Sequence, residues 1–237
     1  RPIVFRPYRG LLAFQSEHSR FFFGRDAEIA EIEKDLQALS AQGKPRLLFV
    51  AGASGTGKSS LVLAGAVPRL LASNPSLVVL RMRPGPSPLR TLDQTLCGIS
   101  AGQSGLLVID QFEELFSQTS LQADRTVFVR RLWALAKAPL PGLQILITLR
   151  VDYIGRCGEL LLDQDGTRLD QVAYDETHRV FVAQLSPKGL TDAIELPARK
   201  VGLSLQPGLT ERMLAEVGQE PGALPLLQDA LDVLWQR

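Results

Sequence analysis

The residues with the clearest chemical potential form a glycine-rich run. Its sequence is Gly52-Ala53-Ser54-Gly55-Thr56-Gly57-Lys58-Ser59, which matches the pattern G-x-x-x-x-G-K-[ST] without a mismatch. Glycines let such a loop curl so that successive backbone N–H groups face inward and hold phosphate oxygens. A helix that starts at the lysine adds the positive end of its dipole. The run therefore predicts a phosphate-binding loop.

The members of this loop have distinct expected roles. A lysine at the position of Lys58 reaches the β- and γ-phosphates of a nucleotide, and the hydroxyl of Ser59 ligates Mg²⁺. A glycine-rich turn that matches by chance is the alternative, and the context decides against it. An apolar strand precedes the loop and a helix from about Lys58 to Leu71 follows it. We expect nucleotide contacts from Gly52, Ser54, Gly55, Thr56, Gly57, Lys58, Ser59 and Ser60.

A second acidic motif follows another apolar run. Asp110 comes directly after Leu106–Ile109, so its carboxylate is expected at the carboxyl end of a buried strand, where ligands bind in open parallel sheets. There it would hold Mg²⁺, directly or through water. Its alternative role is the N-cap of the next helix. Glu113 and Glu114 lie at the start of that helix, and one of them could polarise an attacking water; the alternative is a pair of solvated acids favoured by the helix dipole.

Arg150 completes the candidate catalytic set. It stands at the tip of a fourth apolar run, where a guanidinium can sense and neutralise γ-phosphate charge. The alternative is an ion pair with Asp152 or Asp110. We therefore expect Glu113, Glu114 and Arg150 as catalytic residues, with Ser59 and Asp110 as metal ligands.

The elements that must position these residues alternate between strand and helix. Short apolar runs separated by amphipathic helices predict a parallel sheet covered on both faces. After Pro187 the pattern becomes entirely helical, which predicts a small helical lid. The fold class is thus α/β, a parallel-sheet core followed by a helical lid. The expected strands are 47–51, 77–80, 106–109, 143–148 and, with the weakest pattern, 179–183.

The composition excludes several classes of protein. Lys and Arg total 26 against 25 for Asp and Glu in 237 residues, so no global field attracts nucleic acid or an anionic membrane. No apolar run approaches the ~18 residues of a membrane span. Two cysteines, Cys97 and Cys157, form no disulfide framework, which favours a cytoplasmic location. The chain starts without Met and stops inside a helical pattern, so we expect it to be a piece of a longer protein.

Four places along the chain resemble the nucleotide-binding domain of STAND-class signalling ATPases, relatives of NACHT and NB-ARC domains, and above all a bacterial group of them. They are an entry segment, the phosphate loop (Walker A), an acidic run (Walker B) and a lid element, represented by Pro7–Leu11 with Phe22–Asp26, Gly52–Leu61, Asp110–Leu115 and Pro221–Leu226. The resemblance implies an AAA+/STAND-like P-loop core at 25–185, an N-terminal entry segment at 1–24 near the nucleotide, and a helical lid at 186–237 that is truncated at its C-terminal end.

The resemblance also assigns roles to individual residues. Phe23, Gly24 and Arg25 would lie near the base and ribose, and Pro225 would contact the adenine. Aromatic core packing is the alternative for Phe23 and its neighbour, and a proline in the first turn of a helix is also structurally ordinary. The resemblance prefers Glu113 over Glu114 as the base. Gln111 stands where AAA+ motors carry Glu, which argues against a fast motor.

If the resemblance holds, the chain is a switch that binds ATP or ADP with Mg²⁺ and hydrolyses ATP slowly. The family implies self-association in the ATP state, missing sensor and effector domains, and a link to signalling and antiphage defence. The alternatives are a small-molecule kinase and an ATPase that acts on DNA. The latter would use a small basic run, Arg125, Arg130, Arg131 and Lys137, which reads more simply as the solvated face of a helix.

Overall fold

The computed structural model describes residues 6–100, 102–139, 142–217 and 222–236. The chain divides into two compact units, each built from separate stretches of sequence. The sheet unit comprises Glu31–Gly52 and Arg69–Phe181. The loop unit comprises Arg1–Ala30, Ala53–Pro68 and Val182–Arg237. The first five residues of the expected entry segment and Pro221 of the expected lid element lie outside the described residues.

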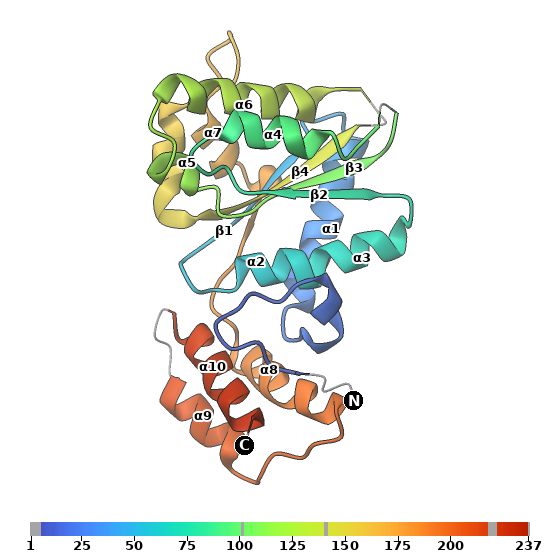
Figure 1. Ribbon diagram of the computed structural model, residues 1–237, viewed down its shortest axis with the longest axis vertical. Helices are drawn as coiled ribbons and strands as arrows, with labels where there is room; N and C mark the ends of the chain where they lie inside the picture. The colour runs from blue at the N-terminus through green and yellow to red at the C-terminus, as the bar shows by residue number, and fades with distance from the viewer. Residues whose placement is uncertain (1–5, 101, 140–141, 218–221, 237) are drawn as a thin grey trace. The chain divides into compact units, whose positions relative to one another are not determined.

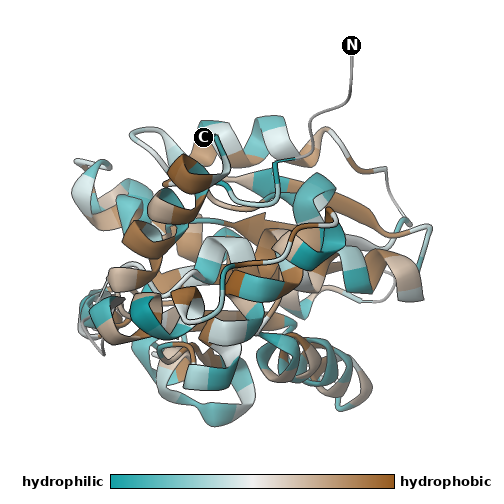
Figure 2. Cartoon of the chain, turned by 90° about the horizontal axis from the view of Figure 1, so that it is seen from below, coloured by the Kyte–Doolittle hydropathy of each residue, from teal (hydrophilic) through white to brown (hydrophobic). Residues whose placement is uncertain are grey.

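The sheet unit contains five strands that run parallel to one another in the order β2-β3-β4-β1-β5 (Figure 1). All six residues of β1 and all five of β3 are buried, which explains why these two strands read as continuous apolar runs; Figure 2 shows much of the sheet in brown. The expected α/β parallel sheet is confirmed. The strands are β1 (Leu47–Gly52), β2 (Val78–Met82), β3 (Gly105–Ile109), β4 (Leu143–Arg150) and β5 (Arg179–Phe181).

Helices cover both faces of this sheet. On one face α4 (Pro88–Leu96) and α6 (Gln122–Lys137) lie side by side and pack on the strands (Figure 1), with Phe128 and Leu132 of α6 fully or almost fully buried. On the other face the Gln144 amide of β4 donates a hydrogen bond of 3.3 Å to the Leu36 carbonyl of α1 (Asp26–Ala41). Further helical segments of this unit include α5 (Glu114–Ser117), η3 (Val151–Glu159), α7 (Leu169–Tyr174) and η4 (Glu176–His178).

The loop unit has a small core of its own. Tyr8, Ile194, Leu227 and Leu231 are buried together, and the Tyr8 hydroxyl donates a hydrogen bond of 2.5 Å to the Ile194 carbonyl. This core joins the N-terminal segment to the C-terminal helices. The helices of the unit include η1 (Ser16–Phe21), α2 (Lys58–Ser60), α8 (Pro187–Lys200), α9 (Leu209–Val217) and α10 (Ala223–Trp235). Among the described residues, no helix is long and apolar enough to cross a membrane.

The helix after the glycine-rich loop differs from the expected continuous α-helix. Between α2 and α3 (Val67–Ser73) the residues Leu61–Ala66 form a π-helix, in which the Val67 N–H donates to the Val62 carbonyl. Pro68 has no N–H for the carbonyl four residues before it, and the Leu63 carbonyl accepts a hydrogen bond of 2.9 Å from the Ser16 hydroxyl. Both features depart from the hydrogen-bond pattern of a regular α-helix, and short π-helical segments are frequent at functional sites.

Candidate functional site

The glycine-rich loop has the curled backbone that its sequence predicts. Gly55 and Gly57 have φ values of 78° and 87°, a region that side chains other than glycine rarely adopt. Lys58 begins α2, and its ammonium group turns back to donate a hydrogen bond of 2.7 Å to the Ala53 carbonyl. The Thr56 hydroxyl donates to the same carbonyl at 3.0 Å. The loop therefore wraps around its own lysine, and this arrangement fits a phosphate group.

A cavity of about 510 Å³ lies within the loop unit at this loop. Gly55 and Thr56 contribute to its wall together with residues of α8 and α10, among them Leu190 and Leu224. Its size is in the range of sites for small organic ligands, which are mostly apolar with a few polar groups. The cavity has room for the base and ribose of a nucleotide whose phosphates lie on the glycine-rich loop.

Arg25 joins three segments of the loop unit. Its side chain is buried, and one guanidinium nitrogen, Nη2, donates to the Thr56 carbonyl at 2.9 Å and to the Ala183 carbonyl at 2.8 Å. The other terminal nitrogen pairs with Glu28. Arg25 also lines the cavity, so it both fixes the loop and borders the ligand space.

Of the other residues that the resemblance places near the base, Pro225 lies beside the glycine-rich loop, whereas Phe23 does not line the cavity. A Cβ built on Gly55 would lie 3.6 Å from the Pro225 ring and 2.9 Å from the Gly222 Cα, so the loop and the start of α10 are in contact. Phe23 is partly exposed and is not among the described residues that line the cavity. Its neighbour Phe22 packs against the Phe14 ring with 5.8 Å between centroids, which is the core role considered as the alternative.

The hydroxyls at the end of the loop have different surroundings. Ser60 accepts a hydrogen bond of 3.0 Å from the Phe14 N–H, so its side chain holds the N-terminal segment. Ser59 is half-buried and Ser54 is exposed. Ser60 thus engages the entry segment through a contact that its sequence position does not predict.

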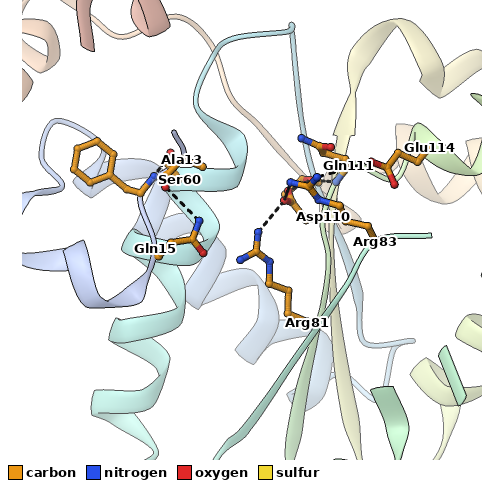
Figure 3. A network of polar contacts seen from close by, with 10 residues as sticks. Ala13, Gln15, Ser60, Arg81, Arg83, Asp110, Gln111 and Glu114 are labelled. Atoms are coloured by element: carbon orange, nitrogen blue, oxygen red, sulfur yellow. Dashed lines mark hydrogen bonds and ion pairs between the residues drawn. The ribbon is translucent and has the colours of Figure 1, made fainter. Parts of the chain in front are cut away.

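Asp110 is the centre of a polar cluster in the sheet unit. Its side chain has no exposed surface, and one oxygen, Oδ1, accepts a hydrogen bond of 2.9 Å from the Thr148 hydroxyl. The other oxygen, Oδ2, lies 3.3 Å from Arg81 Nη2 and 3.4 Å from Arg83 Nη2 (Figure 3). The two guanidinium groups neutralise this buried carboxylate, whose oxygens are ligands that Mg²⁺ prefers. Asp110 therefore fits the expected metal ligand.

The two arginines are members of this cluster that the sequence reasoning missed. A signal was present, because Arg81 follows the expected strand 77–80 directly and Arg83 precedes Pro84-Gly85-Pro86. A charged residue at the carboxyl end of a parallel strand lies at the edge where ligands bind. Its partner could not be known without the neighbouring strand.

The candidate catalytic residues lie close to this cluster. Glu113 Oε2 accepts a hydrogen bond of 3.4 Å from the backbone N–H of Arg150, and Glu114 Oε1 lies 4.0 Å from Arg83 Nη1. The Arg150 side chain pairs with Asp152 through contacts of 3.1 and 2.7 Å. The hydrogen bond from Arg150 to Asp152 raises the pKa of Arg150. The ion pair with Asp152 that was considered as the alternative for Arg150 is therefore present.

Solved structures with similar folds cover almost the whole chain. Domain III of the Thermotoga maritima replication initiation protein DnaA is 13% identical with a TM-score of 0.60, over 94% of this chain and 88% of that one. The Aeropyrum pernix ORC1 protein, solved in complex with DNA, is 16% identical with a TM-score of 0.62, over 93% and 63%. A mutant of Thermotoga maritima RuvB is 17% identical with a TM-score of 0.55, over 96% and 68%. These likenesses show the AAA+ P-loop ATPase fold.

Sequence comparison adds the family. No curated protein sequence gives a significant match. The profile of the family described as Novel STAND NTPase 1 matches residues 7–237, which is nearly the entire chain. This match confirms the resemblance drawn from the entry segment, the glycine-rich loop, the acidic run and the lid element. The chain belongs to the Novel STAND NTPase 1 family.

Proposed function

We propose that this chain is the nucleotide-binding part of an ATP-dependent switch that hydrolyses ATP slowly. The observation that carries the proposal is the complete glycine-rich loop, with Lys58 turned inward, beside a cavity of about 510 Å³ in a chain of an NTPase family. A loop of this kind binds the phosphates of a nucleotide. The cavity supplies room for the base and ribose.

Each residue of the proposed site has a role that its chemistry supports. Lys58 binds the β- and γ-phosphates, while Ser59 and Asp110 hold Mg²⁺, which neutralises phosphate charge when bound. Glu113 is the preferred general base and Glu114 the alternative, because both carboxylates belong to the segment next to Asp110. Arg150 neutralises charge on the γ-phosphate after leaving Asp152.

The base and ribose are assigned to the entry segment and the lid. Phe23, Gly24 and Arg25 border the ribose and base, and Pro225 contacts the adenine. The position of Arg25 in the cavity wall and of Pro225 near Gly55 supports these two assignments. The proposed parts of the chain are an entry segment at 1–24, a core at 25–185 and a lid at 186–237.

The switch itself is proposed from the family. ATP favours one arrangement of lid and core and ADP another, because the γ-phosphate contacts differ. In the ATP state the protein associates with itself and activates an effector in a larger cytoplasmic signalling or antiphage defence protein. Slow hydrolysis by Glu113 resets it.

The first test is calorimetry with ATP and ADP in the presence of Mg²⁺. Lys58→Ala is expected to lower nucleotide affinity at least tenfold, because it removes a charge-assisted hydrogen bond worth about 1.5–3 kcal/mol. The control is Lys34→Ala, which alters a lysine of α1 outside the proposed site and should bind nucleotide like the wild-type protein. Turnover below ~1 per second supports a switch. Equal binding by wild-type and Lys58→Ala would contradict the proposed site.

Two alternatives from other classes have direct tests. A DNA-acting ATPase would bind duplex DNA with strong salt dependence, which fluorescence anisotropy measures. The net charge of +1 argues against DNA binding. The DNA complex of ORC1 is a property of ORC1 alone. A small-molecule kinase would release a phosphorylated product in place of inorganic phosphate. Multi-angle light scattering with ATP and with ADP separates both from a switch, which associates only with ATP.

A further inference from the structure

Asp110 has two arginine partners before any metal is bound. Two acids, Asp110 and Glu114, face two arginines, Arg81 and Arg83. A carboxylate without exposed surface needs such compensation, because an unpaired buried charge costs several kcal/mol or shifts its pKa. The arginines supply part of that compensation in the metal-free protein.

The strand register explains why both arginines reach the same carboxylate. Met82 of β2 pairs with Ile109 of β3, so the residues that follow them, Arg83 and Asp110, leave the sheet on neighbouring strands. Side chains two residues apart on a strand point to the same face, which places Arg81 on the side of Arg83. The Asp110 N–H donates to the Met82 carbonyl at 2.9 Å and fixes this juxtaposition.

Asp110 and its two arginine partners differ in exposure, and this difference favours replacement of the arginines by a metal ion. Asp110 has no exposed side-chain surface, whereas Arg81 is 37% and Arg83 48% exposed. A partly exposed guanidinium can turn into water with little desolvation cost, but the carboxylate cannot move away. A divalent cation that reached Asp110 would add positive charge beside the two guanidinium groups. The arginines are the groups able to leave.

We propose that Arg81 and Arg83 are exchangeable counter-ions of Asp110, which neutralise it in the metal-free state and compete with the divalent cation for its carboxylate. They are positioning residues that act through Asp110 and weaken metal binding. This inference rests on the proposed function, in which Asp110 is a metal ligand. It adds that the end of β2 changes its contacts whenever the metal enters or leaves.

The test measures metal binding and needs no catalysis. Mn²⁺ affinity is determined by electron paramagnetic resonance at saturating ADP for the wild-type protein and for Arg81→Gln, Arg83→Gln and the double variant. The double variant is expected to bind Mn²⁺ about tenfold more tightly, because a competing charge-assisted hydrogen bond is worth about 1.5–3 kcal/mol. The matched control is Arg131→Gln, which removes a 2.6 Å ion pair with Asp93 from an arginine that is 41% exposed.

The outcomes separate this inference from the proposed function. Mn²⁺ affinity that matches the Arg131→Gln control, or that falls, would overturn the inference while leaving the proposed function intact. Weaker ADP binding by the arginine variants in EDTA would also overturn the inference, since that result would mean that the arginines bind the phosphates. Wild-type protein without ADP-dependent Mn²⁺ binding would contradict the proposed function and, with it, the inference.

A second measurement covers variants that fold poorly. Urea unfolding in EDTA is compared for the wild-type protein, Arg83→Lys, Asp110→Asn and the variant that combines Arg83→Lys with Asp110→Asn. If Arg83 compensates the Asp110 carboxylate, Arg83→Lys destabilises the wild-type protein more than it destabilises Asp110→Asn, because lysine lacks the guanidinium fork. Equal destabilisation in both backgrounds would show that the two side chains are not coupled and would overturn the inference.

Discussion

Gln111 has a backbone conformation that its side chain disfavours. Among the described residues it is the only non-glycine with positive φ, at 56°, and its N–H donates a hydrogen bond of 2.8 Å to the Thr148 hydroxyl. The same hydroxyl binds Asp110, so the strained residue links the acidic motif to β4. Backbone strain of this kind tends to occur at functional sites.

Substitution at Gln111 is expected to separate strain from side-chain chemistry. Gln111→Val should lower the free energy of unfolding by about 1–2 kcal/mol, because a β-branched residue is especially unfavourable in the left-handed region. Gln111→Gly should be neutral or slightly stabilising, since glycine adopts this φ freely. Urea unfolding followed by circular dichroism measures both. Similar losses for the two variants would mean that the side chain, and not the backbone, determines the effect.

Gly24 combines positive φ with a close backbone approach. Its φ is 86°, and a Cβ on it would lie 2.3 Å from the Gly189 carbonyl oxygen of α8. Gly24→Ala should therefore lower the free energy of unfolding by more than the ~1–2 kcal/mol of a left-handed alanine alone. Gly43→Ala is the matched control, because Gly43 has φ of 64° with nothing within 4 Å of its Cβ position. If thermal unfolding shows the same loss of stability for Gly24→Ala and Gly43→Ala, the close approach at Gly24 does not determine the effect.

At the scale of the elements, the strands were predictable because their burial is uniform. The run Leu47–Ala51 has no polar face, and the structure extends it by one residue to Gly52 as β1. The weakest expectation, 179–183, is the short edge strand β5 of three residues, Arg179–Phe181, where only Val180 is buried. Edge strands carry a weaker pattern since only part of their surface is covered.

Other features depend on contacts that no local pattern records. The π-helix Leu61–Ala66 is apolar throughout, so its composition fits an ordinary buried helix equally well; the hydrogen bond from Ser16 comes from a distant segment. The pairing of Arg83 with Asp110 requires β2 and β3 to be neighbours, which follows from the strand order. The glycine-rich loop was predicted because its chemistry is contained in eight consecutive residues.

The contact between the N-terminal segment and α8 is expected to weaken at alkaline pH. Burial raises the pKa of Tyr8 from its ordinary value of 10.0 to about 12. The folded protein therefore keeps the Tyr8 proton longer than the unfolded chain does. The stability contribution is complete below the unfolded pKa and is lost as the pH rises from about 10 through about 12.

Urea unfolding between pH 8 and pH 11.5 tests this dependence against Tyr8→Phe. The variant loses the hydrogen bond to Ile194 and about 1 kcal/mol at pH 8. Above a pH of about 10 the wild-type protein should lose stability more steeply than Tyr8→Phe, so the difference between them shrinks. Parallel curves over the whole range would contradict a raised pKa for Tyr8.

At the scale of the whole molecule, the chain passes repeatedly between its two compact units. The loop unit takes Arg1–Ala30 and Ala53–Pro68 from the first third of the sequence and Val182–Arg237 from its end. All five strands precede residue 182, because β5 ends at Phe181. The sheet unit is therefore retained in a fragment that ends at residue 181, but the loop unit is not.

Removal of residues 182–237 should consequently loosen the N-terminal segment while the sheet persists. In fragment 1–181 Tyr8 loses Ile194, and Arg25 loses the Ala183 carbonyl, so both polar contacts and the shared core disappear. Hydrogen exchange followed by mass spectrometry should show lost protection in residues 6–24 and retained protection in β1, β3 and β4. Retained protection in residues 6–24 would show that the C-terminal helices do not hold this segment. Lost protection throughout the strands would show instead that the sheet depends on the loop unit, so the two compact units would fold as one.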